Sequence, residues 1–469
     1  MRRPQLALAS VGILAAAVLV TACTTGEEAS SYDEVVSILW NLAEASPRMH
    51  FTTFGYSREG RALPLLVIGD VEDASPESVR ESGKTRIYLQ GNIHLQGNIH
   101  AGEVAGKEAL LMVAREMADG ANSRWLDSLV LLVGPIYNAD GNERVDLNNR
   151  PRQHGPIGGM GTRPNAMGLD LNRDHMKLDA PESRSLTRFL TAYDPHVTVD
   201  LHVTNGTRHA YMLTYAPPLH PGTPQAVLDL VWDRRLPEVA TRVREMDGWD
   251  FYHYGNLGGA PDGDGRAWVT FDSRPRFGTN YAGLRNRVGI LSEAYSYASF
   301  RDRVYSTLRF VEEVTTFAWA NAAEIRDVTE AQDQEDLVGT LLPTRTRYQA
   351  TPGEVEILMG DVVERLRAHG VRTEVLGQEE TRTVEAFRIS ARIAAERPFQ
   401  DRTEQEIQGR YELREVHLPE GTVRVDVRQP LGRLAFMLLE PRSHDGFANW
   451  GLLATELGAG DLYPIFRVP

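Results

Sequence analysis

Apolar residues recur along this chain with two different periods, and the alternation between them predicts the elements of one large domain. Short continuous apolar runs predict buried strands, and longer runs with the period of an α-helix predict amphipathic helices. The predicted strands cover residues 63–68, 87–90, 129–133, 196–202 and 288–293. The predicted helices cover residues 31–45, 104–117, 181–193, 228–246 and 303–323. Strands that alternate with helices indicate an α/β domain with a mixed, largely parallel sheet flanked by helices.

The pattern changes after about residue 328, where an acidic stretch at 331–335 precedes short segments of alternating polarity. Residues 422–427 and 434–439 predict strands, and residues 354–369 predict a helix. We therefore expect one domain at 33–328 and a smaller, mainly β accessory domain at 336–469.

The N-terminus has the pattern of an export signal. Met1-Arg2-Arg3 is basic, residues 6–20 are apolar, and Val20-Thr21-Ala22-Cys23 follows. The apolar run is short for a membrane span and is typical of a signal peptide. The residues before Cys23, the only cysteine, resemble the lipobox of bacterial lipoproteins. This implies a signal peptide at 1–22, a lipidated Cys23, a tether at 23–32 and an anchored protein in the bacterial cell envelope, on the periplasmic side or at the cell surface. The alternative is an ordinary signal peptide or anchor helix with an incidental cysteine.

The charge of the chain narrows the choice of partners. The net charge is −14 over 469 residues, and no block of lysine and arginine interrupts the acidic balance. A surface of this kind repels a phosphate backbone, so nucleic acid is not an expected partner.

Two histidines and a glutamate lie where predicted strands end. His100 and Glu103 follow the strand at 87–90, and His202 ends the strand at 196–202. The carboxyl ends of strands in an open α/β sheet form the usual ligand site, so these side chains can converge. Two imidazoles and one carboxylate leave an open fourth position on Zn²⁺, as a catalytic site requires. The alternatives are an incidental His and Glu at a turn and a structural histidine at a strand end.

Further motifs accompany these three residues along the chain. The motifs are H-x-x-E at 100–103, N-x-D-G at 138–141, R-x-N-x-x-G-x-D-L-N-R at 163–173, a strand ending in D-L-H at 200–202 and a later strand ending in Glu293. In this order the chain resembles the zinc metallocarboxypeptidases of the carboxypeptidase A/B superfamily over roughly residues 33–325. The resemblance implies one zinc ion per chain, held by His100, Glu103 and His202, with Asp170 orienting the first histidine.

The same resemblance implies the roles of four further residues. Asn172 and Arg173 match the pair that binds the terminal carboxylate of the substrate, a role for which a guanidinium fork is well suited. Arg163 matches the arginine that polarises the scissile carbonyl and holds the developing oxyanion. Glu293 matches the general base, which takes a proton from the attacking water and delivers one to the leaving amine. Without the zinc set, Arg163, Asn172 and Arg173 would be read as a solvated loop.

The chain departs from the family pattern at two places. No tyrosine stands at residues 268–273, where the family often has one that closes over the substrate. The hexapeptide Leu-Gln-Gly-Asn-Ile-His occurs at 89–94 and again at 95–100. Only His100 has a glutamate three residues later, so the second copy supplies the ligand. We expect the second copy to fill the strand and the first to be extruded upstream, because that arrangement keeps the ligand set intact.

The resulting hypothesis is a zinc-dependent carboxypeptidase that hydrolyses the C-terminal peptide bond of peptides with metal-activated water. Its expected partners are a peptide with a free C-terminal carboxylate and, through Cys23, a membrane. Three alternatives stay open. The first is a hydrolase of peptidoglycan stem peptides or of N-acyl amino acids on the same scaffold, the second a catalytically impaired binding module, and the third a purely structural lipoprotein.

Overall fold

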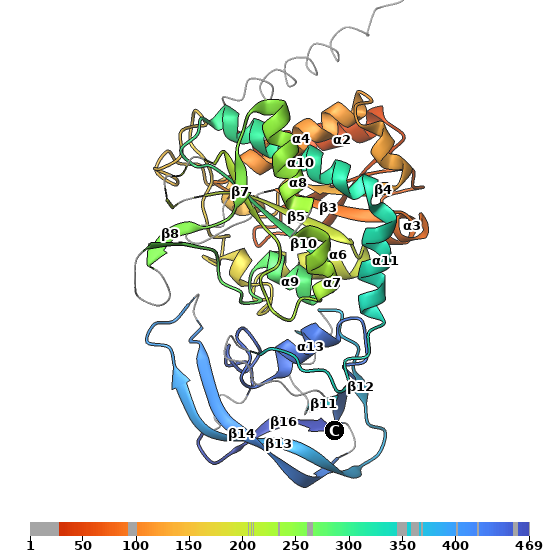
Figure 1. Cartoon of the computed structure of the whole chain (residues 1–469), viewed down its shortest axis with the longest axis vertical. Coiled ribbons are helices and arrows are strands. Elements are labelled where there is room, and N and C mark those ends of the chain that lie inside the picture. The colour runs from red at the N-terminus through yellow and green to blue at the C-terminus, as the bar shows by residue number, and fades with distance from the viewer. Residues whose placement is uncertain are drawn as a thin grey trace, which may run out of the picture.

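The computed structural model describes most of the chain from residue 28 onward (Figure 1). The described ranges are 28–91, 101–204, 206–207, 209, 211–232, 235–259, 266–344, 354–357, 365–366, 369–399, 402–419, 422–453 and 458–468. Within these ranges, no helix is long and apolar enough to cross a membrane.

An eight-stranded sheet forms the centre of the larger domain, in the order β1-β2-β4-β3-β5-β10-β6-β7. Its strands are β1 (Met49–Tyr56), β2 (Ala62–Ile68), β3 (Thr85–Gly91), β4 (Leu129–Gly134), β5 (Val197–Val203), β6 (Leu213–Ala216), β7 (Phe251–His253) and β10 (Val288–Ala294). The four central strands β4, β3, β5 and β10 run parallel to one another. Antiparallel pairs join β1 to β2, β2 to β4 and β6 to β10. The mixed, largely parallel sheet predicted from the sequence is confirmed.

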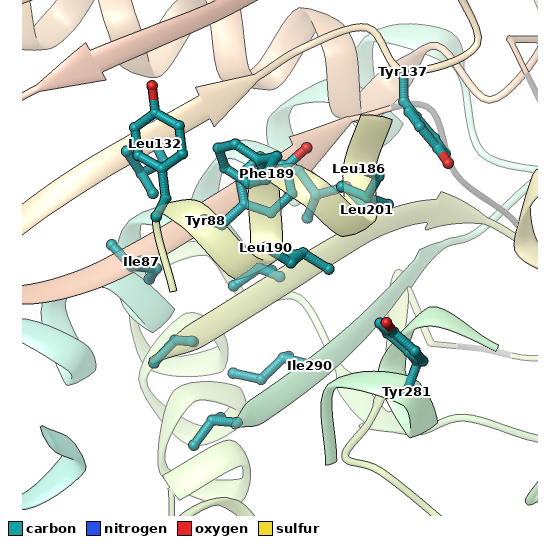
Figure 2. Close-up of a cluster of buried hydrophobic side chains, with 14 of the residues drawn as sticks. Ile87, Tyr88, Leu132, Tyr137, Leu186, Phe189, Leu190, Leu201, Tyr281 and Ile290 are labelled. Atoms are coloured by element: carbon teal, nitrogen blue, oxygen red, sulfur yellow. The ribbon is translucent and has the colours of Figure 1, made fainter. Parts of the chain in front are cut away.

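Helices cover both faces of this sheet (Figure 1). Helices α4 (Ala105–Ala118) and α10 (Phe300–Ala320) pack on one face, and α6 (Pro181–Ala192) and α9 (Gly278–Leu284) pack on the other. Tyr88 of β3 packs on Phe189 of α6 with ring centroids 4.5 Å apart (Figure 2). Because successive strand residues point to opposite faces, Ile87 faces the other layer. Burial of large apolar side chains on both faces accounts for the near-continuous apolar runs of the central strands.

Six further helices complete the described part of the larger domain. They are α2 (Tyr32–Ala45), α3 (Pro76–Glu81), α5 (Ala139–Asn142), α7 (Gln225–Val231), α8 (Arg235–Asp247) and α11 (Ala322–Asp333). Short 3₁₀ turns occupy η1 (Ser123–Asp127) and η2 (Leu171–Arg173), and β8 (Asn256–Gly259) pairs with β9 (Arg266–Val269).

A smaller, six-stranded sheet follows, in the order β12-β15-β11-β16-β13-β14. It contains β11 (Glu354–Ile357), β12 (Glu374–Val375), β13 (Glu380–Ala394), β14 (Gln405–Leu418), β15 (Val423–Val425) and β16 (Leu462–Val468). Helix α13 (Gly432–Leu439) lies on the side of this sheet that faces the larger domain (Figure 1). A β-rich C-terminal region was expected, and it is present.

Several element predictions were wrong in detail. Residues 354–357 form a strand that pairs with both β15 and β16, where the sequence predicted the start of a helix. Residues 434–439 lie in helix α13 and are buried all round, so their apolar run carries no strand period. The single helix predicted at 228–246 is divided between α7 and α8. The short helix α3, which Ser75 caps, lies between β2 and β3, where the sequence predicted no element.

The expectation about the duplicated hexapeptide was also wrong. The first three residues of the first copy continue the strand, because Leu89 and Gln90 of β3 pair with Val133 and Gly134 of β4, and Gly91 pairs with Leu201 of β5. Residues 92–100, which include the last three residues of the first copy and the whole second copy, lie outside the described residues.

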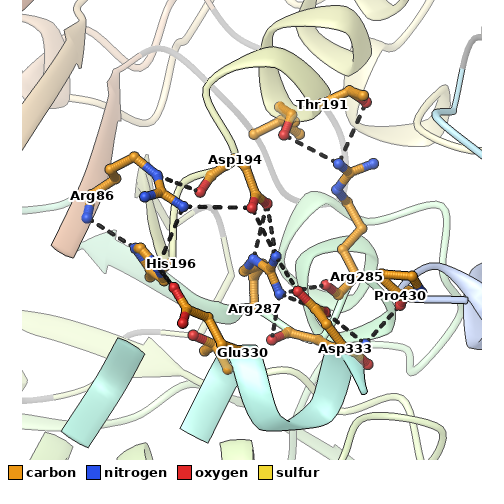
Figure 3. A network of polar contacts seen from close by, with 12 residues as sticks. Arg86, Thr191, Asp194, His196, Arg285, Arg287, Glu330, Asp333 and Pro430 are labelled. Carbon is orange, nitrogen blue, oxygen red and sulfur yellow. Dashed lines mark hydrogen bonds and ion pairs between the residues drawn. The ribbon is translucent and has the colours of Figure 1, made fainter. Parts of the chain in front are cut away.

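A network of ion pairs ties the amino ends of the central strands together (Figure 3). Arg287, just before β10, binds Asp194 at 2.8 Å and Asp333 of α11 at 2.7 Å. The backbone N–H of Arg86 in β3 donates to Nδ1 of His196, just before β5, at 3.0 Å. These contacts fix the three strands relative to one another, so their carboxyl ends present side chains in a defined register.

Candidate active site

The carboxyl ends of β5 and β10 place two of the predicted site residues side by side. The strands run parallel, and in their register Glu293 lies directly opposite His202. Both side chains are buried. Oε1 of Glu293 has no hydrogen-bond partner among the described residues, so a buried carboxylate oxygen is available at this edge of the sheet.

Glu103 reaches the same point from the other side, because it lies just before the first turn of α4. Its Oε2 atom is 3.2 Å from Nδ1 of His202 and accepts the backbone N–H of Val203, also at 3.2 Å. Gly102 is required beside it. A Cβ atom there would lie 2.7 Å from the carbonyl oxygen of Gly161 and 2.9 Å from the side chain of Arg150. The glycine of the H-x-x-E turn therefore lets the turn pack against the long loop at 142–169.

The geometry of these donors fits a zinc ion. Tetrahedral bonds of about 2.0–2.2 Å put two donor atoms roughly 3.3–3.6 Å apart. The separation of 3.2 Å between Nδ1 of His202 and Oε2 of Glu103 is close to that range. Burial, followed by the charges of nearby arginines, holds the pKa of His202 well below its ordinary value, so the ring is neutral and able to bind a metal. No cluster of three metal-binding side chains occurs among the described residues. The third predicted ligand, His100, lies outside them.

Three arginines surround this pair. The Arg150 guanidinium donates a hydrogen bond to Oε1 of Glu103, and that of Arg163 donates one to Asp170. Together with Arg173, their charges lower the pKa of His202 further. Burial raises the pKa of Glu103 to about 7, and the charge and hydrogen bond of Arg150 oppose that rise. His202 and Glu103 therefore lie buried among charges of both signs, those of the three arginines and those of Asp200 and Glu293.

The predicted carboxylate-binding pair lies in the 3₁₀ turn η2, which Asp170 caps by accepting the backbone N–H of Asn172 at 3.1 Å. Oδ1 of Asn172 accepts the backbone N–H of Gly278 at 2.6 Å. The guanidinium of Arg173 lies 4.1 Å from the ring centroid of Phe277. Burial lowers the pKa of Arg173, but a guanidinium stays charged at neutral pH. Segment 277–278 thus supports both members of the pair.

Three site residues were missed by sequence reasoning. Arg150 contacts Glu103 but lies in a stretch of polar residues with no distinguishing pattern. Asp200 has Oδ1 2.9 Å from Nε2 of His202, and its place two residues earlier on the same strand was a usable signal. Tyr254 is buried near Glu293, and burial first and the charge of Glu293 second raise the pKa of its hydroxyl. It lies upstream of the region searched for a tyrosine.

Asp170 was expected to orient His100, but its partners among the described residues are Arg163 and Asn172. Its carboxylate binds Arg163 and the backbone of Asn172. Its predicted role toward His100, like the lipidation of Cys23, concerns residues outside the described ranges and stays a prediction.

The α/β sheet carries a buried His202–Glu103 pair at its carboxyl edge with Glu293 beside it, an arrangement that a metal-dependent hydrolase would need. Residues 35–205 match the model of the zinc carboxypeptidase family, peptidase M14. This match supports a metallocarboxypeptidase and covers residues 35–205 of the 469.

Curated relatives match over most of the chain. Carboxypeptidase 2 of Trichophyton rubrum is 24% identical over 502 residues, which cover 94% of this chain and 87% of the relative. Carboxypeptidase 2 of Trichophyton tonsurans is 25% identical over 471 residues, with 88% and 81% covered. A solved metallo-carboxypeptidase from Burkholderia cenocepacia is similar with a TM-score of 0.43 and 15% identity, over 62% of this chain and 70% of that one. This last likeness is remote, and the fold rests on the sheet order and register described above.

Proposed function

We propose that the chain is a zinc-dependent carboxypeptidase that hydrolyses the C-terminal peptide bond of peptides by metal-activated water. The observation that carries the proposal is the placement of Glu293 opposite His202 in the β5–β10 register, with Glu103 3.2 Å from the same histidine. His100, Glu103 and His202 would hold the metal. A zinc ion bound there would lower the pKa of a water molecule and polarise a carbonyl group.

In this proposal, each remaining residue acts on one part of the substrate. Glu293 accepts a proton from the attacking water at its unpartnered Oε1 atom and later donates a proton to the leaving amine. Arg163 stabilises the negative charge that develops on the carbonyl oxygen. Arg173 and Asn172 bind the terminal carboxylate and thereby fix which bond is cleaved.

The decisive variant is Glu293→Gln, which keeps the shape of the side chain but cannot accept a proton. We expect kcat to fall by about 10²–10⁴-fold, while zinc content and the free energy of unfolding stay near the wild-type values. Glu238→Gln, on the exposed face of α8, is the matched control and should leave kcat unchanged. A wild-type kcat in the Glu293→Gln variant would remove Glu293 from the mechanism.

The second candidate function is a catalytically impaired binding module, and the duplicated hexapeptide is the observation that supports it. With the first copy in β3, the six extra residues lie between the strand and Glu103. A zinc-poor protein without turnover on any peptide would support that candidate. The class of peptide stays open too, since the same carboxylate-binding residues serve peptidoglycan stem peptides and N-acyl amino acids. Rates on acyl-dipeptides beside rates on muropeptides would separate these substrates.

We also propose that Cys23 is lipidated and anchors the protein in the bacterial cell envelope. The support is the sequence pattern at 1–23. Cys23→Ser should leave the chain unprocessed or shift it to the soluble fraction on cell fractionation. An unchanged amount in the membrane fraction would contradict the lipid anchor.

A further inference from the structure

A buried arginine next to the carboxylate-binding pair binds the C-terminal domain. Arg276, two residues before α9, is 2% exposed, and its partner Asp445 in the C-terminal domain is fully buried. Nε of Arg276 donates to Oδ1 of Asp445 at 2.5 Å, and its backbone N–H donates to Oδ2 at 3.0 Å. Nη1 of Arg276 also donates to Oε1 of Glu404 at 3.1 Å.

Several contacts hold the C-terminal side of this ion pair. Asp445 has φ of 62°, a left-handed conformation that a non-glycine residue keeps only when its surroundings hold it. Its backbone N–H donates to Oδ1 of Asn449 at 3.0 Å, and Nδ2 of Asn449 donates to the carbonyl of Gln405, next to Glu404, at 2.8 Å. The guanidinium of Arg276 also lies 4.6 Å from the ring centroid of Trp450. Burial alone would raise the pKa of Asp445, but the charge of Arg276 and its hydrogen bonds hold that pKa below the ordinary value.

The other side of the contact leads directly to the carboxylate-binding pair. Phe277 and Gly278 follow Arg276 in the chain. The Phe277 ring lies under the guanidinium of Arg173, and the N–H of Gly278 binds Asn172. The carbonyl of Arg276 is 3.1 Å from Nδ1 of His175, two residues after Arg173. A displacement of residue 276 would therefore move the supports of both Asn172 and Arg173.

We propose that the C-terminal domain completes the substrate-carboxylate site, with Asp445 and Glu404 as positioning residues that hold segment 276–278 against Asn172 and Arg173. This inference rests on the proposed function, because it assigns the terminal carboxylate of the substrate to that pair. It gives the accessory domain a share in substrate selection: the domain supports the group that distinguishes a free C-terminus from a blocked one.

The test compares an acyl-dipeptide that has a free carboxylate with the same peptide carrying a C-terminal amide. Asp445→Asn removes the charge, keeps an acceptor for the N–H of Arg276 and tolerates a positive φ. We expect KM for the free acid to rise about tenfold, less than the roughly hundredfold cost that a displacement of 1 Å can have. We expect kcat to stay within about twofold and the amide rate to be unchanged, because only binding of the carboxylate is affected.

The matched control is Glu335→Gln, which removes another ion pair to the C-terminal domain, between Glu335 and Arg433 of α13. It should leave both substrates unaffected. An equal loss on acid and amide, no change in Asp445→Asn, or the same KM shift in Glu335→Gln would overturn the inference.

A variant that does not fold and a wild type without preference for the free acid are also interpretable outcomes. If Asp445→Asn does not fold, Glu404→Gln, at a less buried position, is judged by the same criteria. A wild-type protein that does not prefer the free acid refutes the proposed function and this inference with it. A wild-type preference that survives in the variants refutes the inference alone.

Discussion

Replacement of Arg173 by alanine would test whether this side chain recognises the terminal carboxylate. The guanidinium is buried and packs on the Phe277 ring at 4.1 Å, so a carboxylate that reaches it meets a charge shielded from water. Hydrogen bonds to a charged group contribute about 1.5–3 kcal/mol, which corresponds to a loss in kcat/KM of roughly 10- to 150-fold. The loss should fall on KM, because the carboxylate is bound alike in the ground state and the transition state.

The assay measures kcat/KM for an acyl-dipeptide and for its C-terminal amide, with Arg188→Ala as the control. Arg188 is an exposed arginine on α6, and its loss should change neither rate. The amide should be a poor substrate for the wild type and little affected by Arg173→Ala. Arg173→Lys should recover only part of the affinity, since an ammonium group lacks the planar fork. An equal fall on both substrates would show that Arg173 is structural.

Three other changes test the ligands, the insertion and the buried ion network. His202→Ala should lower bound zinc from one ion per chain, as elemental analysis would show, and equal zinc in both proteins would refute its role as a ligand. Deletion of residues 95–100 should raise the thermal midpoint and leave activity similar or higher; a switch from an inactive, zinc-poor chain to an active one would mean that the duplication disables the natural protein. His196→Asn should flatten the pH dependence of stability. Burial first, and then the charges of Arg86 and Arg287, lower the pKa of His196 to about 3 from an ordinary value of 6.5. Its neutral form therefore stabilises the fold fully above pH 6.5, and that stability is lost as the pH falls toward 3, by up to about 1.4 kcal/mol per pH unit. Urea unfolding of both proteins between pH 7 and pH 4 measures the difference, and identical slopes would contradict it.

The central sheet could be predicted because its strands are buried on both faces. Continuous apolar runs such as residues 129–133 and 288–293 have few other interpretations when helical patterns separate them. Helix α13 was missed for the same reason, since a segment buried all round, such as Leu434–Leu439, loses the period that tells a helix from a strand. Local pattern also could not place Glu354–Ile357, because its strand depends on β15 and β16, which lie far away in the sequence.

The site residues differ in how far sequence could locate them. His202 and Glu293 could be placed at strand ends, and the parallel register makes them neighbours. The contacts of Arg150 and Arg276 could not be predicted, because each is made with a partner distant in the chain, Glu103 in one case and Asp445 in the other. A sequence motif identifies residues that stand at a fixed spacing in the chain. A contact between two domains joins residues with no fixed spacing, so a motif cannot identify it.

The duplicated hexapeptide shows how upstream pairing decides between two identical segments. The prediction was based on keeping the geometry of the turn that carries His100 and Glu103. The period of the strand could not decide between the copies, because both place the same side chains on the same face. Pairing of β3, however, begins at Thr85, opposite Leu129 of β4, and continues through Tyr88 without a break into the first copy. Filling the strand with the second copy would have required the chain to leave the sheet after Tyr88 and return, which would expose backbone groups at the centre of a buried sheet. Glu103 is held independently, by Arg150 and by the backbone of Val203. The described chain on either side of residues 92–100 is therefore held by its own contacts, at Gly91 and at Glu103.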